Sequence, residues 1–336
     1  MTRRRALTLR PIPSAPSSEI ITPAVTEDYI RYLSNPRNGI CVDQQRVIIS
    51  LDYASQELRV AAVVSKDPAM CNSYFQPEYL TSASGKVYKN PANDLHLLTA
   101  ATVTHPHIIE GHPEEDWFDL LTIVYPGEKT SPRQTGKTHN FGSIYLSSAQ
   151  SVSSRNHIKL DVAESWVKRH KQTYAGYYEW AEYYGNIAAA RGFAVAPYTG
   201  RLRWILEERS SGKEGDSAVR AAVNHAIQSL SADQTKESMI RLNQRFKDSP
   251  VKIIGQIHDE ILIEAPGQSW VDWDKSKIEN GVYTELKFGY DEEAESWALI
   301  AKEIMENVQT EMFEALGSDI KGSASYSNAI GPVWAH

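Results

Sequence analysis

The sequence predicts an α+β fold in which an antiparallel β-sheet lies beside a mostly helical insertion. β-branched runs occur near both ends of the chain, VIISLDYA at residues 47–54 and VKIIGQIHDEILIEAP at residues 251–266, and both are typical of strands. Long helical patterns fill most of the chain between them. Strands grouped apart from helices, without an internal repeat, favour α+β over the strand–helix alternation of a parallel sheet.

The composition is that of an ordinary globular protein. Its 336 residues suffice for one large or two modest domains, with 41% hydrophobic and 23% charged residues. No apolar run is long enough to cross a bilayer, and the basic N-terminus lacks the apolar segment of a secretory signal. We therefore expect no membrane partner. Cys41 and Cys71 fit no metal-binding spacing and imply no disulfide framework, so we expect a reducing, cytoplasmic location. The net charge of −7 decides nothing about nucleic acid, because it is unevenly spread.

Local signals predict the elements of the first half. Residues 1–45 form an arm with a short helix near EDYIRYLS, and a helix in ELRVAAVVS follows the first strand. Residues 71–90 are predicted to be irregular. NDLHLLTAATVTH begins a helix capped by Asn93 or Asp94. SPRQTGKTHNFGSIYLSS forms another helix, with Ser131 as its cap and a proline in its first turn.

The second half contains three long helices and two ribbons. One helix covers residues 160–190 and ends at Gly192, another lies in DSAVRAAVNHAIQSLSADQTKESMIRLNQRF, and the third spans residues 291–316. FAVAPYTGRLRWI is typical of a hairpin, and VKIIGQIHDEILIEAP of two short strands around a tight polar turn. The tail after the third helix is predicted to be irregular.

Acidic residues stand where apolar strands end. Asp52 follows VIISL, and Asp259 and Glu260 separate IIGQI from ILIE. An unpaired carboxylate is costly to bury, and paired aspartates suit Mg²⁺, which prefers oxygen ligands. Two ions about 4 Å apart would clamp the attacking and leaving oxygens of a phosphoryl transfer. The alternative is a turn or cap residue, and for one strand-end aspartate alone that interpretation is the better one.

Two helix faces carry side chains at four-residue steps. The first face has two cations and two aromatics, Arg133, Lys137, Phe141 and Tyr145, a set that suits the phosphates, sugar and base of a nucleoside triphosphate. By spacing alone, solvated cations beside a core-facing aromatic pair are slightly favoured over this reading. The second face has three donors that could grip the minor groove without reading sequence: Arg220, Asn224 and Gln228. An ordinary polar face is the simpler interpretation there, and His96 taken alone is a weak candidate.

Together these segments resemble family A DNA polymerases, the group of bacterial DNA polymerase I and many phage replicases. LDYASQELRVAA is similar to motif A of the family, RQTGKTHNFGSIY to motif B and QIHDEILIE to motif C. Four further segments resemble the family in the family's order: NDLHLLTA, RGFAVAPYTGRLR, RAAVNHAIQ and the final VWAH. The similarity extends from about Val47 to His336.

The resemblance implies a template-directed DNA polymerase that adds dNTPs to a primer 3′-hydroxyl with two Mg²⁺ ions, Mn²⁺ being the alternative. Asp52 and Asp259 would bind the metal ions, Glu260 would support the catalytic site, and Lys137 would hold the triphosphate and donate a proton to leaving pyrophosphate. The other nucleotide-binding residues would be Glu57 (the gate against a ribose hydroxyl), His96, Arg133, Phe141 and Tyr145. The residues that contact primer–template DNA would be Arg220, Asn224, Gln228 and His258.

The resemblance also implies a palm (residues 46–92 and 192–336) built on the antiparallel sheet and mostly helical fingers (residues 93–191). The family's helical thumb and 3′–5′ exonuclease precede motif A, and too few residues precede Asp52 to hold a thumb. We therefore expect a split enzyme of phage or bacterial origin, in which a second protein supplies the thumb, and possibly the exonuclease, and docks on residues 1–45. Leu146 replaces a common family glycine, which leaves the turn after motif B open.

Three other functions stay open from the sequence. A single-subunit RNA polymerase shares the two aspartates and the Arg–Lys helix, but Glu57 and the H-D-E turn favour a DNA polymerase. A non-catalytic scaffold or accessory subunit has no physical need for the full set of acidic and basic residues. A two-metal nuclease would need neither a gate residue nor an aromatic face for dNTPs.

Overall fold

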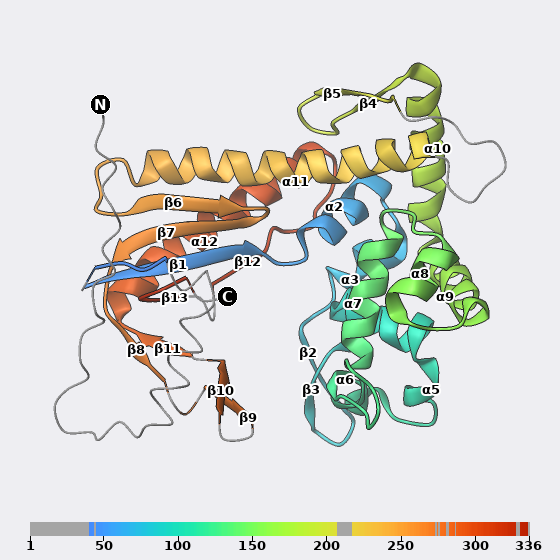
Figure 1. The fold of residues 1–336 in the computed structure, drawn as a ribbon, viewed down its shortest axis with the longest axis horizontal. Helices are drawn as coiled ribbons and strands as arrows, with labels where there is room; N and C mark the ends of the chain where they lie inside the picture. Colours follow the sequence, from blue (N-terminus) through green and yellow to red (C-terminus); the bar gives the residue numbers. More distant parts are fainter. Residues whose placement is uncertain are drawn as a thin grey trace.

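A sheet lobe and a helical lobe make up the computed structural model (Figure 1). The structure describes residues 40–43, 45–206, 217–272, 274, 276–279, 282–285, 287–326 and 330–334. Helix α11 (Ser217–Arg245) runs along the sheet lobe and continues to the helical lobe, so one rigid element joins the two. The predicted helix near EDYIRYLS, like most of the predicted arm, lies outside the described residues.

The sheet is antiparallel and is built around its first strand. The strand order is β12-β1-β7-β6, and β13 also pairs with β1. The strands are β1 (Arg46–Tyr53), β6 (Lys252–Ile257), β7 (Glu260–Pro266), β12 (Ala324–Ser325) and β13 (Ile330–Gly331). The α+β prediction is confirmed. The prediction of an irregular tail is wrong at β12 and β13, because two-residue strands carry no periodicity and form only against the edge of β1.

Alternation along β1 gives the strand two faces that pack against different parts of the protein. Val47, Ile49 and Leu51 point into a core that also includes side chains of α11 and α12 (Glu292–Ala315). Each is fully buried, which stabilises the fold by roughly 1.5–3 kcal/mol per side chain. The alternate positions, including Ser50 and Asp52, therefore lie on the opposite face.

The helical lobe contains more elements than the sequence predicts. Residues 71–90, predicted to be irregular, contain the end of a helix and a β-hairpin. The elements are α2 (Gln56–Ser65), α3 (Pro68–Ser73), β2 (Tyr79–Thr81), β3 (Val87–Lys89), η2 (Pro91–Asn93), α4 (Leu95–Thr99), the π-helix η3 (Ala100–Thr104), α5 (Pro106–Ile109), α6 (Glu114–Thr122), α7 (Pro132–Ser143), α8 (Ala149–Asn156), α9 (Leu160–Thr173) and α10 (Ala175–Arg191).

The long helix predicted over residues 160–190 is broken at Tyr174, and a distant carboxylate caps its second part. The break between α9 and α10 falls at Tyr174, whose backbone is not helical. Asp67 is buried and comes from a distant part of the chain. Its carboxylate accepts a hydrogen bond from the Tyr177 amide (3.1 Å) in the first turn of α10. Asp67 thus caps α10 across the lobe, a tertiary contact that no local sequence signal predicts.

Small ribbons complete the two lobes. The predicted hairpin is confirmed as β4 (Phe193–Val195) and β5 (Leu202–Trp204), and further pairs form β8 (Ser269–Val271) with β11 (Phe288–Tyr290) and β9 (Lys277–Glu279) with β10 (Val282–Glu285). None of the helices in the described ranges combines the length and the apolar character that a membrane span requires.

The turn after α7 is a Schellman motif with leucine in the glycine position. Ser147 donates its amide to the Gly142 carbonyl (3.1 Å), and Leu146 donates to the Ser143 carbonyl (2.9 Å). Leu146 takes a φ of 54°, in the left-handed region that glycine adopts without cost. The chain therefore turns here as it would with glycine, at a conformational cost of about 1–2 kcal/mol.

Leu146→Ile is expected to lower the free energy of unfolding by about 1–2 kcal/mol, because a β-branched side chain tolerates positive φ worse than leucine does. Urea denaturation measures the effect. Leu160→Ile, at an exposed helical position, serves as the matched control and should cost less than about 0.5 kcal/mol. Equal costs at the two positions would show that the conformation of Leu146 stores no strain.

Candidate active site

The structure brings the two predicted aspartates together. Asp52 lies near the end of β1, and Asp259 lies in the two-residue turn that the Ile257–Glu260 pair closes between β6 and β7. Burial, and after it the neighbouring charges of Asp259 and Glu260, together raise the pKa of Asp52 to about 7. The pair is therefore a site of concentrated, incompletely balanced negative charge.

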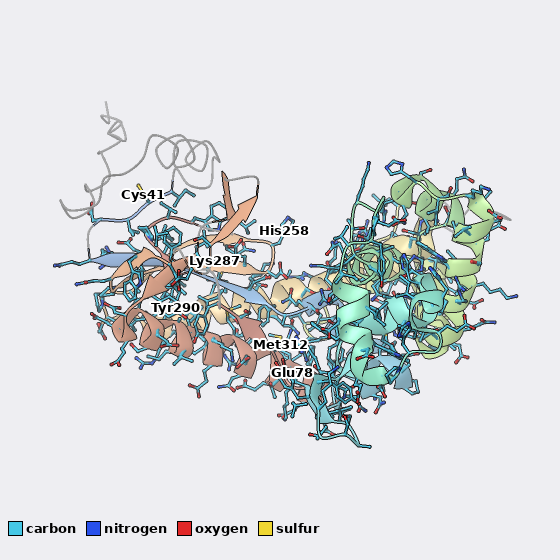
Figure 2. The ribbon with its side chains drawn as sticks, turned by 90° about the horizontal axis from the view of Figure 1, so that it is seen from below. Cys41, Glu78, His258, Lys287, Tyr290 and Met312 are labelled. Atoms are coloured by element: carbon cyan, nitrogen blue, oxygen red, sulfur yellow. The ribbon has the colours of Figure 1, made fainter. Side chains whose placement is uncertain are left out.

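The turn that carries Asp259 holds its shape against a local conformational cost. His258 precedes Asp259 and takes a φ of 54°, which is unfavourable for a residue with a Cβ. The Gln256 side-chain amide donates a hydrogen bond to the His258 carbonyl and supports this conformation. Figure 2 shows the His258 side chain at the edge of the sheet lobe that faces the helical lobe. Strain of this kind persists where the surrounding structure fixes the geometry, as it does here next to Asp259.

Lys137 approaches the aspartates from the other lobe. It lies on α7, and its positive charge lowers the pKa of Asp52, opposing the effect of burial and of the neighbouring carboxylates. Its Nζ lies 6.0 Å from the centre of the Phe141 ring. The predicted helix face with Arg133, Lys137 and Phe141 is thus present on α7, with its lysine turned toward the carboxylates.

Glu57 and Tyr145 lie next to each other beside the aspartates. Glu57 is in the first turn of α2, and burial raises its pKa, with the charge of Asp259 as a further cause. Burial also raises the pKa of Tyr145, whose buried hydroxyl is close to Glu57 and Gln228 but has regular hydrogen-bond geometry to neither. Tyr145 therefore lies where α2, the end of α7 and α11 come close to one another.

Asp94 connects two of the predicted triphosphate-binding residues. Its Oδ2 accepts a hydrogen bond from Arg133 Nε (2.7 Å), and its Oδ1 caps α4 by accepting from the His96 amide (2.9 Å). Burial alone would raise the pKa of Asp94, but Arg133 brings it below its ordinary value. In the sequence, Asp94 is recognisable only as a possible helix cap. Its spacing to Arg133 carries no local signal, so the ion pair could not be predicted.

His96 is more enclosed than a solvent-facing phosphate ligand would be. It is 4% exposed, and burial lowers its pKa to about 4, so the neutral imidazole dominates. Asn140 donates to His96 Nδ1 (3.2 Å) and to the Leu95 carbonyl (3.1 Å), which fixes the ring. A Cβ added to Gly136 would lie 2.4 Å from the His96 carbonyl oxygen, so glycine permits the close packing of α7 on α4.

The three predicted DNA-binding residues of α11 share one stripe of that helix. Gln228 is exposed, while Arg220 and Asn224 are half-buried. The Asn224 Oδ1 atom is buried and has no hydrogen-bond partner among the described residues. Gln228 lies near the Tyr145 hydroxyl, so one end of this stripe lies beside Glu57 and Tyr145.

The donor set of the aspartate pair fits Mg²⁺. Within the described ranges no three His, Cys, Asp or Glu side chains converge as a complete metal site. Mg²⁺ commonly binds one or two carboxylates and completes its octahedron with water and substrate phosphates. The raised pKa of Asp52 indicates negative charge that a divalent cation would neutralise. Asp52 and Asp259 therefore suit a metal ion that arrives with a phosphorylated substrate.

The family model described as DNA polymerase family A matches residues 23–288. The chain belongs to DNA polymerase family A. Three curated polymerases of the family are similar over most of its length. DNA polymerase I of Treponema pallidum is 30% identical over 223 residues, covering 65% of this chain and 19% of that protein. The DNA polymerase of Mycobacterium phage D29 is 28% identical over 242 residues (72% and 32%), and the thermostable DNA polymerase I of Thermus aquaticus is 26% identical over 274 residues (81% and 26%).

The solved structures show the same fold. The polymerase domain of Pol1 from M. smegmatis, in complex with DNA primer-template and dNTP, superposes with a TM-score of 0.60 at 21% identity. The match covers 89% of this family A chain and 42% of that chain. The chain thus spans less than a third of the length of the Treponema and Thermus relatives. The expected thumb-supplying partner stays a prediction.

Proposed function

We propose that the chain carries the palm and fingers of a template-directed DNA polymerase that adds dNTPs to a primer 3′-hydroxyl. The observation that carries the proposal is the convergence of Asp52, near the end of β1, and Asp259, in the turn between β6 and β7, opposite Lys137 from α7. Two carboxylates facing a cation across two lobes suit phosphoryl transfer between a hydroxyl and a triphosphate. A scaffold would have no use for this costly arrangement of like charges.

Each residue has a distinct part in the proposed reaction. Asp52 and Asp259 would hold Mg²⁺, which when bound neutralises charge on the phosphates and activates the attacking hydroxyl. Lys137 would contact the triphosphate and protonate the leaving pyrophosphate. Arg133 would present its Nη atoms to phosphate while Asp94 holds Nε, and the neutral His96 would contribute a hydrogen bond rather than a charge.

The palm, residues 46–92 and 192–336, and the fingers, residues 93–191, would enclose the nucleotide between them. Phe141 and Tyr145 would line the sugar and base side, and the α11 stripe with His258 would meet the primer–template near its reacting end. α7 is the element that would close on a matched pair, since its side chains reach across toward the palm carboxylates.

Primer extension tests the proposal. We expect the full chain, with Mg²⁺ and dNTPs, to extend a primer in the order that the template dictates. Enzyme in excess over primer–template is used so that a low affinity for the duplex does not prevent extension. Asp259→Ala should abolish extension. An active Asp259→Ala variant, or no extension by the unaltered chain with either Mg²⁺ or Mn²⁺, would contradict the proposal.

Glu57→Ala is expected to increase ribonucleotide incorporation relative to dNTP by about 100-fold. The Glu57 carboxylate is largely enclosed near Asp259 and Tyr145, and an added 2′-hydroxyl would meet it without room for water. Incorporation of NTP and dNTP opposite the same template base measures the ratio. Glu78→Ala, at an exposed position, is the matched control. An unchanged ratio would assign sugar selection elsewhere, and a preference for NTPs in the unaltered chain would favour an RNA polymerase.

A further inference from the structure

Glu260, the residue after the catalytic Asp259, is held by two donors from distant parts of the chain. Its Oε1 accepts hydrogen bonds from the Ser50 hydroxyl and from Trp334 Nε1 (2.8 Å). Glu260 is 6% exposed and Trp334 is 8% exposed, so both groups interact inside the protein rather than at its surface. Charge-assisted hydrogen bonds of this kind are stronger than neutral ones, and a buried carboxylate depends on them.

The tail that carries Trp334 is itself fixed to the sheet. β13 pairs with β1, and the Trp334 amide donates to the Ile40 carbonyl (3.0 Å). The indole packs with Ile48 and Leu262 on the face of β1 and β7 opposite the core formed with α11 and α12. Alternation places Ser50 on this same face, between Ile48 and the catalytic Asp52. The tail, β1 and the first residue of β7 therefore meet at the Glu260 carboxylate.

We propose that Trp334 is a positioning residue for the reaction, which acts by fixing Glu260 and through it the turn that carries Asp259. This proposal rests on the proposed function, whereas the hydrogen bond between Trp334 and Glu260 is observed independently of it. Glu260 already influences Asp52, since its charge helps to raise the pKa of that aspartate. Without Trp334 the Glu260 carboxylate would be held by the Ser50 hydroxyl alone, and the Asp259 backbone beside it would lose one of its anchors. Partners of this indirect kind typically change metal affinity or activity by 10- to 100-fold when removed.

Trp334→Phe is the central test, because phenylalanine keeps an aromatic ring against Ile48 and Leu262 while it removes the N–H donor. We expect kcat for single-nucleotide addition to fall by about 10- to 100-fold while the KM for dNTP changes less than about twofold. Trp270→Phe, at an exposed tryptophan of β8, is the matched control and should leave both constants unchanged. Unchanged kcat in Trp334→Phe, or an effect confined to KM, would overturn the proposal.

A double-mutant cycle shows whether Trp334 acts through Glu260. In a Glu260→Ala background, which has no side-chain acceptor for the indole N–H, Trp334→Phe should reduce kcat by less than about twofold further. Equal losses in both backgrounds would show that the tryptophan acts independently of Glu260, as a general structural residue. Ser50→Ala should reproduce part of the Trp334→Phe loss, since it removes the second donor to the same oxygen.

A metal titration provides a readout that needs no turnover. The Mg²⁺ concentration that gives half of the maximal rise in unfolding temperature should be about 10-fold higher for Trp334→Phe than for the unaltered chain and Trp270→Phe. Identical titrations would contradict the positioning role even if the chain proved inactive as a polymerase. An inactive unaltered chain with the expected shift would refute the proposed function alone.

Discussion

Asp52→Asn is expected to stabilise the metal-free protein while it reduces nucleotide addition by more than about 1,000-fold. Asparagine keeps the size of the side chain but removes a negative charge that the fold accommodates poorly. Burial and the charges of Asp259 and Glu260 raise the pKa of Asp52 to about 7. Loss of the carboxylate would remove a ligand for the metal on which the proposed reaction depends.

The pH dependence of this stabilisation follows from the direction of the shift. The pKa of Asp52 is higher in the folded chain than in the unfolded chain, so the folded state binds the proton more tightly. The stabilising effect of the protonated group is complete below the unfolded value of 3.8 and is lost as the pH rises through about 7. At pH 8 the ionised Asp52 therefore destabilises the protein, whereas at pH 4 it does not.

Urea denaturation of Asp52→Asn at pH 8 and pH 4 measures the effect. We expect a gain of about 1 kcal/mol at pH 8, because solvent access to the side chain screens much of the repulsion, and little change at pH 4. Asp248→Asn, at an exposed position, is the control and should change stability at neither pH. A variant that is both inactive and less stable at pH 8 would assign Asp52 a structural role instead.

The sequence predicts those features whose local pattern and physical cause coincide. The strand before Asp52 is fixed by β-branched residues that alternate between two faces, and Ser131 caps α7 by accepting from the Gln134 amide (3.3 Å). The i, i+4 spacing then determines which side chains share a face of α7. These features depend on neighbours in sequence, so the sequence alone predicts them.

The sequence alone does not predict contacts whose partners are far apart in the chain. Asp67 caps α10 from another part of the lobe, where an uninterrupted helical pattern contains a break. Trp334 and Ser50 reach Glu260 from opposite ends of the sequence, and the motif around Glu260 gives no sign of its donors. Leu146 illustrates the reverse: the sequence departs from the family's glycine, yet the backbone keeps the glycine conformation and accepts its cost.

Lys137→Ala is expected to reduce kcat for nucleotide addition by about 100- to 10,000-fold, the range typical of a lost general acid. Lys137 is the α7 side chain whose charge reaches Asp52, so the same substitution should also raise the KM for dNTP. Single-turnover primer extension separates the two effects. Lys168→Ala, at an exposed position of α9, is the matched control and should behave as the unaltered chain does.

Two further comparisons separate proton donation by Lys137 from simple charge. Lys137→Arg keeps a positive charge that arginine cannot release as a proton, so it should restore KM more than kcat. A dNTP analogue with a more acidic leaving group needs less proton transfer, and the loss caused by Lys137→Ala should shrink with it. If the loss is the same for both leaving groups, Lys137 acts only by its charge. The position of Lys137 on α7, near Asp52, would then serve only to bind the triphosphate. The proton would have to come from another donor or from water.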